Sequence, residues 1–280
     1  MSDKTCLVTG ASSGIGKETA LGLARLGFSV VLACRNRERG HAALDYIRQK
    51  TGSSALELIM VDLADLGSVR RMAAEYLETR DRTDVLVNNA GLILTKRSVT
   101  VDGFETTFQV NYLSHFLLTR LLLDSLKRSA PSRIINVSSG AHTSGHIRFD
   151  DLQCARGYNA FKAYGQSKLA QVLFTYELSR RTSGKRVDVN CLHPGAVATN
   201  WGRGGGDWLS FGLRLASVFE MSPQRGAETS LFLASDPRLE GVSGKYFTNK
   251  KETESSAESH DIDEARRLWD ESCRLLGIQA

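Results

Sequence analysis

The sequence is poor in proline, and its 280 residues contain no long apolar run. Only 4 residues are proline, and hydrophobic residues make up an ordinary 41% of the chain, which excludes collagen-like and intrinsically disordered chains. No run approaches the ~18 consecutive apolar residues of a membrane-spanning helix, so we expect no transmembrane anchor. The first residues, Met1-Ser2-Asp3-Lys4, lead directly into a strand-like run, which leaves no room there for a signal peptide. These features predict a cytoplasmic protein.

Cysteine is also scarce. The 5 cysteines are Cys6, Cys34, Cys154, Cys191 and Cys273, an odd number, and no two have the C-x-x-C spacing of redox and metal motifs. A disulfide-stapled mini-protein is therefore excluded, and a reducing, intracellular compartment is favoured. Cys6, Cys34 and Cys191 lie inside apolar runs, where cysteine usually packs as a small core residue.

Neither sign of charge dominates. The 36 Lys and Arg residues exceed the 31 Asp and Glu residues by a formal +5. This mild excess suits a small polyanionic ligand. The sequence lacks the basic stripe with interleaved aromatic residues that nucleic-acid-binding proteins use, so we expect no nucleic-acid partner.

Short apolar runs alternate with amphipathic stretches along the chain. The expected strands are 4–9, 28–34, 56–61, 84–88, 133–138, 186–192 and 244–248, and the expected helices are 14–26, 37–50, 65–79, 103–129, 158–181, 223–234 and 262–276. Continuous apolar strands separated by helices predict a parallel sheet covered on both faces. With right-handed crossovers, the fold class is α/β, a doubly wound (Rossmann) sheet of seven parallel strands. No linker interrupts the alternation, so residues 1–280 form a single domain.

Two stretches interrupt this alternation. Residues 200–222 begin with several glycines and then carry large apolar residues, among them Trp208, Phe211 and Phe219. Residues 249–261 are polar and without periodicity, and we interpret them as a solvated loop.

A glycine-rich loop follows the first strand. The segment Thr9-Gly10-Ala11-Ser12-Ser13-Gly14-Ile15-Gly16 passes directly into a helix, where glycines allow a tight turn and a pyrophosphate can rest on the helix N-terminus. The spacing is G-x-x-x-G-x-G rather than the general G-x-G-x-x-G. Three glycines alone can be a simple turn, but their place after the first strand of a βαβ pattern favours dinucleotide binding.

The end of the second strand bears on the choice of cofactor. An NAD site usually has an acid about 20 residues beyond the glycines, whereas this strand ends in Arg35-Asn36-Arg37. Arg35, with Ser12, Lys17 or Arg37 nearby, would bind a 2′-phosphate and favour NADP over NAD by about ten- to a hundredfold. The alternative is that these arginines only solvate the start of a helix.

The spacing Tyr-x-x-x-Lys occurs three times, as Tyr46/Lys50, Tyr158/Lys162 and Tyr164/Lys168. On a helix this spacing puts both side chains on one face, and an ammonium near a phenol favours the phenolate. Such a tyrosine can exchange a proton with a carbonyl or an alcohol. Tyr164/Lys168 is best embedded in the apolar periodicity of the helix after the fifth strand. That strand delivers Ser138 and Ser139 at its carboxyl end, where open α/β sheets bind ligands.

Together these residues resemble the short-chain dehydrogenase/reductase family. The matching features are T-G-x-x-x-G-x-G, Asn88-Asn89-Ala90-Gly91, Ser139, Tyr164-x-x-x-Lys168 and Pro194-Gly195, all in family order over nearly the whole chain. The phrases Ala33-Cys34-Arg35 and His193-Pro194-Gly195 and the segment from Tyr164 to Ala170 are similar to the retinol dehydrogenase-like branch. Members of that branch mostly prefer NADP(H) and act on retinoids, other apolar aldehydes or ketones.

The resemblance implies four catalytic residues. Tyr164 would be the general acid/base, and Lys168 would lower its pKa and hold the nicotinamide ribose hydroxyls. Ser139 would hydrogen-bond the substrate oxygen, and Asn111 would support a water linked to Lys168. Without the family, Ser139 can be a turn hydroxyl and Asn111 a helix kink.

The resemblance also implies an NADP(H) site. Asp62 would contact the adenine, although it can also be a helix N-cap. Asn88 would contact the adenosine ribose through its backbone, and residues 194–199 would meet the nicotinamide carboxamide. The full set of expected cofactor contacts is Gly10, Ser12, Ser13, Gly14, Ile15, Gly16, Arg35, Asp62, Leu63, Asn89, Ala90, Gly91, Tyr164, Lys168, Pro194, Gly195, Val197 and Thr199.

One departure from the family concerns spacing. Ser139 and Tyr164 are 25 residues apart, about twice the separation in many members, which leaves Tyr158 as a competitor. The inserted loop carries His142, His146 and Cys154, but the absence of a fourth ligand argues against zinc. We expect no metal, and we expect the histidines to line the substrate cleft.

The sequence therefore predicts an NADP(H)-dependent oxidoreductase for a small hydrophobic carbonyl or alcohol substrate. Residues 200–222 fall where the family has its substrate lid, although a subunit contact or a membrane contact remains an alternative. The family commonly forms dimers or tetramers through helices corresponding to 103–129 and 158–181, so a homodimer or tetramer is expected here. A non-catalytic NADP(H)-binding sensor or scaffold on the same fold is the alternative function.

Overall fold

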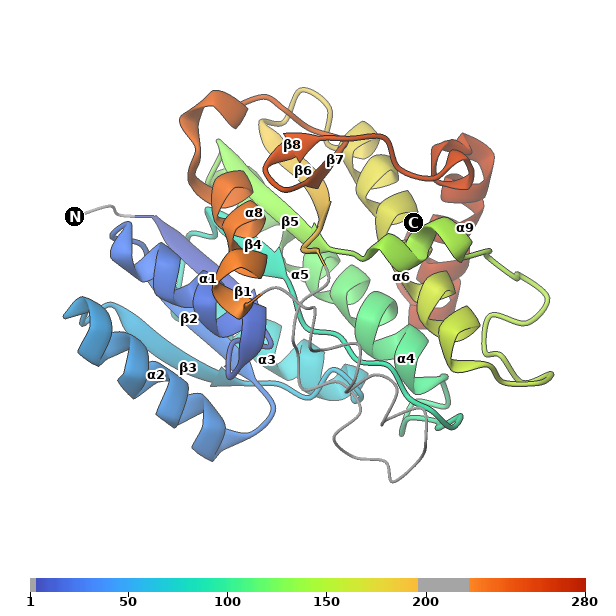
Figure 1. The fold of residues 1–280 in the computed structure, drawn as a ribbon, viewed down its shortest axis with the longest axis horizontal. Helices are drawn as coiled ribbons and strands as arrows, with labels where there is room; N and C mark the ends of the chain where they lie inside the picture. Colours follow the sequence, from blue (N-terminus) through green and yellow to red (C-terminus); the bar gives the residue numbers. More distant parts are fainter. Residues whose placement is uncertain (1–3, 196–221) are drawn as a thin grey trace.

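The computed structural model describes residues 4–195 and 222–280, and within them eight strands form one sheet (Figure 1). The strand order is β3-β2-β1-β4-β5-β6-β7-β8, and all neighbouring pairs up to β7 are parallel. The strands are β1 (Thr5–Thr9), β2 (Ser29–Cys34), β3 (Leu56–Met60), β4 (Val85–Asn88), β5 (Ser132–Val137), β6 (Val187–His193), β7 (Lys245–Thr248) and β8 (Lys251–Glu252). The seven predicted strands are confirmed, and both ends of each strand lie within one residue of the predicted ends.

The eighth strand corrects the prediction of seven parallel strands. β8 pairs antiparallel with β7, and the two intervening residues, Asn249 and Lys250, have φ of 51° and 61°. Positive φ at both central residues is the geometry of a tight hairpin turn whose twist matches that of the strands. The polar segment 249–261 is therefore not entirely a loop, since it also contains the turn η5 (Ala257–His260).

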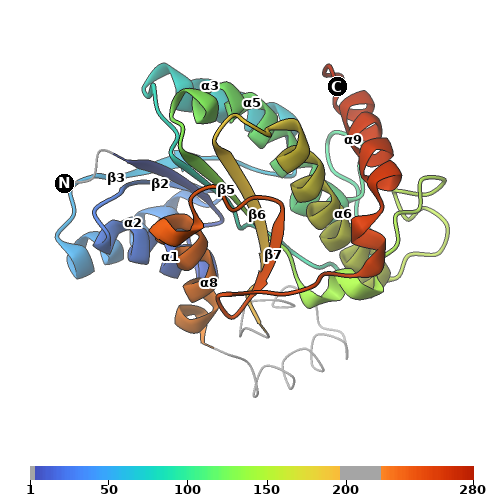
Figure 2. The ribbon, with the colours of Figure 1, turned by 90° about the horizontal axis from the view of Figure 1, so that it is seen from above.

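Helices cover both faces of the sheet, as Figure 2 shows from above. The helices α1 (Gly14–Arg25), α2 (Arg37–Thr51) and α8 (Pro223–Ser235) pack on one face, whereas α3 (Leu66–Glu78), α5 (Ser114–Arg128) and α6 (Ala160–Arg181) pack on the other. Because both faces are covered, β1, β2, β4, β5 and β6 are buried at nearly every position, as in other parallel sheets. Cys6 and Val8 belong to the core on the first face, and Leu7 belongs to the core on the second.

The stretch predicted as one helix over 103–129 is divided. It consists of α4 (Thr106–Phe108), a π-helical turn η1 (Gln109–Leu113) and α5, and the amide of Ser114 donates to the carbonyl of Gln109 five residues earlier. π-helical turns are rare and often occur at functional sites. The apolar periodicity continues through the turn, so the sequence pattern does not reveal it.

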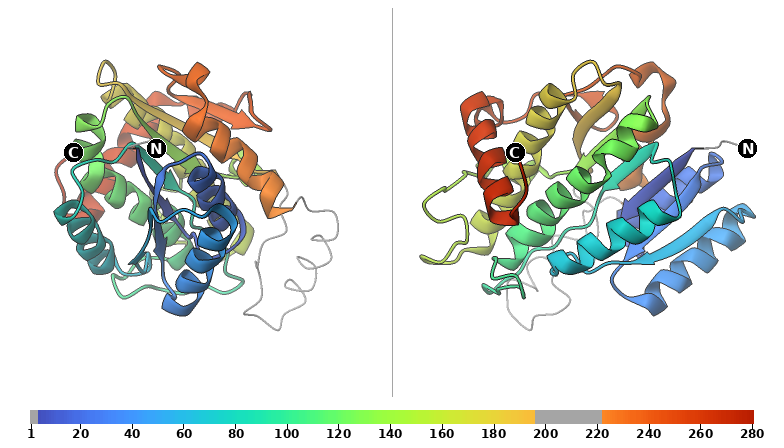
Figure 3. Two further views of the ribbon diagram at one scale, coloured as in Figure 1. Left: turned by 90° about the vertical axis from the view of Figure 1, so that its left-hand side faces the viewer. Right: turned by 180° about the vertical axis from the view of Figure 1, so that it is seen from behind.

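The last helix, α9 (Ile262–Leu276), packs on the outer side of α5 and α6 (Figure 3). The ring of Trp269 lies 4.9 Å from that of Phe116 and 6.0 Å from that of Phe174, between ring centroids. Among the described helices, none is both long and apolar enough to cross a lipid bilayer.

Candidate active site

The site lies where the strand order reverses, between β1 and β4. In open α/β sheets this reversal creates a crevice beyond the carboxyl ends of the strands. The glycine loop leaves β1 on one side of the crevice, and Asn89-Ala90-Gly91 leaves β4 on the other.

The glycine loop fits a bound pyrophosphate. A Cβ atom on Gly16 would lie 2.5 Å from both the carbonyl oxygen of Gly10 and Nδ2 of Asn89, so only glycine permits this packing. Gly14 has φ of +57° and open space where a Cβ atom would be. Helix α1 begins there without a side-chain cap from Ser13 and without an acid in its first turn. Its first amides therefore remain available to an anion.

Ser12 of the glycine loop lies next to Cys34, which is the last residue of β2 and precedes Arg35. Burial raises the pKa of the Cys34 thiol to about 11, and the Ser12 hydroxyl hydrogen-bonds that thiol. Arg35 itself is exposed. Lys17 lies 4.4 Å from the Tyr46 ring centroid, which brings a second cation to the neighbouring α1–α2 surface.

Asp62 and Leu63 follow β3 at the same edge. Asp62 is not a helix cap, since Asp65 accepts the amide of Ser68 at the start of α3. Asp62 Oδ1 instead accepts the amide of Ala64 at 2.9 Å, a local turn that holds the carboxylate half-buried. The carbonyl of Leu63 accepts hydrogen bonds from Gln109 and Ser114, which fixes this turn against η1 and α5.

The segment after β4 is held against β1. The amides of Asn89 and Ala90 both donate to Oγ1 of Thr9, at 2.9 and 3.0 Å, and Nδ2 of Asn89 donates to the carbonyl of Thr9. Asn88 turns into the core, where its Nδ2 donates to Thr119 and Asn136. Its side chain therefore supports the sheet.

Ser139 and Tyr164 meet at the carboxyl end of β5. Their side chains are hydrogen-bonded, and Tyr164 is almost fully buried on α6. The backbones of Gly145 and Gly165 approach so closely that a Cβ atom on Gly145 would collide with the carbonyl of Gly165. This packing holds the loop after Ser139 against the first turns of α6, despite the 25-residue separation.

Lys168 lies one turn after Tyr164, with Nζ 5.5 Å from the phenol ring centroid. Its Nζ donates to the carbonyl of Val137 and to Oε1 of Gln171, both at 2.9 Å. Burial lowers the pKa of Lys168 to about 7. Sequence reasoning missed Gln171, although its i, i+3 spacing from Lys168 on one helix could have indicated it.

Burial raises the pKa of Tyr164, and the hydrogen bond with Ser139 only partly opposes this. The physical reason is that Tyr164 and Lys168 are both desolvated, and desolvation disfavours the phenolate as it disfavours the ammonium. That Lys168 lowers the pKa of Tyr164 stays an expectation implied by the family resemblance.

Asn111 lies in the π-helical turn η1 and is fully buried. Its Oδ1 accepts the amide of Leu92 at 2.8 Å, and its Nδ2 donates to the carbonyl of Leu92 and to Oγ of Ser167. A Cβ atom on Gly91 would lie 3.4 Å from Oδ1 of Asn111 and 3.5 Å from Nζ of Lys168. Asn111, Gly91 and Lys168 are therefore neighbours, and Ser167 and Leu92 are further site residues that the motifs did not reveal.

The two competing Tyr–Lys pairs have other surroundings. The hydroxyl of Tyr158 donates to the carbonyl of Leu94 at 2.8 Å, and Lys162 is exposed. Tyr46 lies on α2, on the opposite side of the molecule from α6 (Figure 1), between Lys17 and Lys50.

The side chains weighed as zinc ligands have separate protein partners. His142 is buried, with Nδ1 2.7 Å from the carbonyl of Ser139 and Nε2 accepting the amide of Ser256. His146 is exposed beside Glu258, and Cys154 accepts a hydrogen bond from Arg148. In residues 4–195 and 222–280 no cluster of His, Cys, Asp and Glu is arranged to hold a metal ion.

The structure describes only part of the expected nicotinamide segment. Pro194 and Gly195 directly follow β6 at the carboxyl edge. Val197, Thr199 and residues 200–221 of the expected lid lie outside the described residues.

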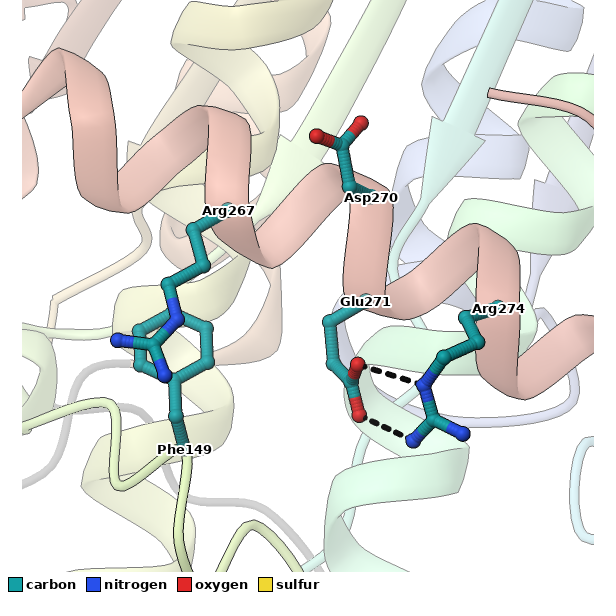
Figure 4. Close-up of a pocket in the computed structure, with 5 residues that line it drawn as sticks. All are labelled: Phe149, Arg267, Asp270, Glu271 and Arg274. Atoms are coloured by element: carbon teal, nitrogen blue, oxygen red, sulfur yellow. Dashed lines mark hydrogen bonds and ion pairs between the residues drawn. The ribbon is translucent and has the colours of Figure 1, made fainter.

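A hollow of about 480 Å³ lies elsewhere, on the outer face of α9 (Figure 4). Its cations already have partners: Arg267 lies 3.9 Å from the Phe149 ring centroid, and Arg274 pairs with Glu271 at 2.6 Å. None of the expected site residues lines it.

Comparisons with known proteins agree with this geometry. The chain is 50% identical to human "Retinol dehydrogenase 13" and 45% identical to human "Retinol dehydrogenase 14", in each case over 99% of this chain and 86% or 88% of the relative. A crystal structure of an uncharacterized protein from Mycobacterium paratuberculosis matches with a TM-score of 0.79, at 33% identity over 99% of this chain and 94% of the other. The Pseudomonas aeruginosa RhlG/NADP active-site complex matches with a TM-score of 0.70, at 29% identity over 88% and 94%. The family model described as "short chain dehydrogenase" matches residues 4–208. The chain therefore belongs to the short-chain dehydrogenase family, and within it to the branch that resembles the retinol dehydrogenases.

Proposed function

We propose that this protein is an NADP(H)-dependent oxidoreductase that interconverts a hydrophobic aldehyde or ketone and its alcohol. The observation that carries the proposal is the contact between Tyr164 and Ser139, with Nζ of Lys168 5.5 Å from the phenol ring. These groups lie at the carboxyl ends of the strands, beside a glycine loop that leaves its helix amides available to a phosphate.

Each side chain has a defined task in this proposal. Ser139 hydrogen-bonds the substrate oxygen and orients the carbonyl toward Tyr164. The phenol of Tyr164 donates a proton to that oxygen during reduction and takes it back during oxidation. Lys168, anchored by Val137 and Gln171, supplies donors for the ribose hydroxyls. When bound, the nicotinamide cofactor supplies or accepts the hydride at its C4 atom.

The choice of NADP(H) rests on the end of β2. Arg35 directly follows β2, and Ser12 hydrogen-bonds Cys34, the last residue of that strand. A guanidinium pairs well with a phosphate. The relation to a solved NADP complex is consistent with this choice.

The substrate class rests on the named relatives, which are retinol dehydrogenases. We therefore take all-trans-retinal as the first substrate to test, with residues 200–222 as the proposed apolar lid. A cytoplasmic location remains a proposal, based on five cysteines that are all buried and free.

Helix α9 covers part of the helices 103–129 and 158–181, through which a dimer or tetramer is expected. Trp269 covers Phe116 and Phe174 within the same chain. We therefore propose that any homo-oligomer forms through another face.

The function is tested by following NADPH oxidation, with NADH in parallel, using all-trans-retinal. Turnover with NADPH at least about tenfold faster than with NADH would support both the cofactor and the substrate class. Tight NADPH binding without turnover of retinal or of other apolar carbonyls would contradict the enzymatic proposal and favour an NADP(H) sensor.

A further inference from the structure

His115 connects the two halves of the candidate site. It is 1% exposed and lies in the first turn of α5, directly after the π-helical turn. Its Nδ1 is 3.0 Å from the backbone carbonyl of Asn111, and its Nε2 is 3.0 Å from Oγ1 of Thr9. One ring therefore contacts a catalytic candidate and the last residue of β1, which precedes the glycine loop.

The direction of these hydrogen bonds follows from the chemistry of the partners. A carbonyl oxygen only accepts, so Nδ1 of His115 carries the proton and donates to Asn111. In a neutral ring Nε2 then accepts, and the Thr9 hydroxyl donates to it. The carbonyl of Val87 competes for the Thr9 proton, but at 3.4 Å it is the more distant acceptor.

The chain of hydrogen bonds continues to the other wall of the crevice. Oγ1 of Thr9 accepts the amides of Asn89 and Ala90, and these residues precede Gly91 beside Lys168. The order is Asn111 carbonyl, His115, Thr9, then the Asn89 and Ala90 amides. The Asn111 carbonyl fixes the tautomer of His115, and Nε2 of His115 is the nearer of the two acceptors of the Thr9 hydroxyl, at 3.0 Å against 3.4 Å for the Val87 carbonyl.

We propose that His115 is a positioning residue that sets the Asn111 carbonyl and the Asn89–Ala90 backbone in register with each other. The inference rests on the proposed function, because it assigns these contacts to the alignment of the catalytic turn with the cofactor site. It needs a neutral ring, since an imidazolium would have no acceptor for Thr9. Burial, helped by the nearby Lys168 and opposed by the hydrogen bond to Asn111, lowers the pKa of His115 to about 4.

Two substitutions separate the two contacts. In His115→Asn the amide nitrogen takes the place of Nδ1 and keeps the donor to Asn111, while the acceptor for Thr9 is lost. In His115→Gln the amide oxygen takes the place of Nε2 and keeps the acceptor for Thr9, while the donor to Asn111 is lost. Tyr112→Phe is the matched control: it removes a buried hydrogen bond of the same π-helical turn, but that bond points to Ser272 of α9.

The expected result is a split between kcat and cofactor affinity. We expect His115→Gln to lower kcat about tenfold with the Kd of NADPH little changed, and His115→Asn to raise that Kd about tenfold with kcat better preserved. Tyr112→Phe should lower the stability of the protein and change neither kcat nor the Kd of NADPH. The positioning role is wrong if both His115 variants change kcat and the Kd of NADPH to the same extent. It is also wrong if they lower only the stability, as the control does.

An NMR measurement separates failure of this inference from failure of the proposed function. Nitrogen-15 spectra of the imidazole rings, with His115 assigned by its loss in His115→Gln, should show the neutral Nδ1–H tautomer unchanged between about pH 5.5 and 8. An Nε2–H tautomer, or titration in that range, would overturn the inference even in an active enzyme. The wild-type protein could instead be inactive toward all carbonyls, while His115 has this tautomer and His115→Asn, but not His115→Gln, weakens NADPH binding. That result would overturn the proposed function and leave the connection between Asn111 and Thr9 standing.

Discussion

The Nζ atom of Lys168 donates to Oε1 of Gln171, three residues later on the same helix, at 2.9 Å. The amide oxygen is a neutral acceptor, so it stabilises the ammonium less than a carboxylate would. Burial therefore prevails, and the pKa of Lys168 falls to about 7. The ammonium of Lys168 is therefore a group of the site that titrates near neutral pH.

The first prediction concerns the pH dependence of turnover. Because the pKa of Lys168 is lowered, its ammonium is present below about pH 7 and is lost as the pH rises through that value. We expect kcat/KM for carbonyl reduction to fall over the same range. In Gln171→Glu the added carboxylate favours the ammonium, so the descending limb should move up by about one unit or more.

The control for this experiment is Gln166→Glu. Gln166 is a buried glutamine of the same helix that contacts Arg148 and Leu152 instead of Lys168. Its substitution should leave the position of the limb unchanged. A limb that stays near pH 7 in Gln171→Glu would mean that Lys168 is not the titrating group.

The second prediction distinguishes the tyrosines. Tyr158→Phe removes the hydrogen bonds of this hydroxyl to the carbonyl of Leu94 and to Thr107, so we expect a loss of about 1–2 kcal/mol in unfolding free energy and little change in kcat. Tyr46→Phe should also leave kcat unchanged. Steady-state kinetics beside urea unfolding measure both quantities, and loss of turnover in Tyr158→Phe would assign the proton transfer to that residue instead.

The third prediction concerns Arg35. Its replacement by alanine should reduce the preference for NADPH over NADH by about ten- to a hundredfold, because one charge-assisted contact to the 2′-phosphate is lost. Arg48→Ala is the matched control, since Arg48 is likewise an exposed arginine but lies on α2 and pairs with Asp45 at 3.0 Å. Equal cofactor preference in the wild type and in Arg35→Ala would mean that Arg35 only solvates the start of the helix.

The fourth prediction concerns α9. Trp269 is 3% exposed and packs on Phe116 and Phe174, so Trp269→Ala should lower the unfolding free energy by about 3–5 kcal/mol. Ile262→Ala, on the same helix at a position 46% exposed, should change it by about 0.5 kcal/mol or less. Urea unfolding measures the unfolding free energy of both variants, and the comparison requires that their m-values are equal. Similar small losses in both would show that α9 adds little to the core.

Much of the fold follows from the sequence because a parallel sheet is buried on both faces. Val30 to Cys34, for example, is apolar throughout and buried throughout, so the pattern locates the strand directly. β8 lacks this signal: Lys251 and Glu252 are polar and exposed, and their pairing depends on the turn at Asn249 and Lys250. The π-helical turn is likewise invisible, because a single widened turn hardly changes a helical periodicity.

The candidate site was predictable where a residue belongs to a short motif and not where it acts through tertiary contacts. Ser139, Tyr164 and Lys168 are found from spacing and strand ends, and the structure brings them together. His115 contacts Thr9 across 106 residues of sequence, a relationship that no local pattern encodes. The burial that raises the pKa of Tyr164 was likewise not predictable, because the spacing of a tyrosine and a lysine carries no information about their burial.

The most direct test of the account is the rate of NADPH-dependent reduction of all-trans-retinal by Tyr164→Phe beside the wild type, with the NADPH dissociation constant measured for both. The account predicts that turnover falls about 10²–10⁴-fold, the usual contribution of general acid catalysis, while the dissociation constant stays nearly unchanged. Turnover that survives in Tyr164→Phe would contradict the assignment of Tyr164 as the proton donor and, with it, the central claim.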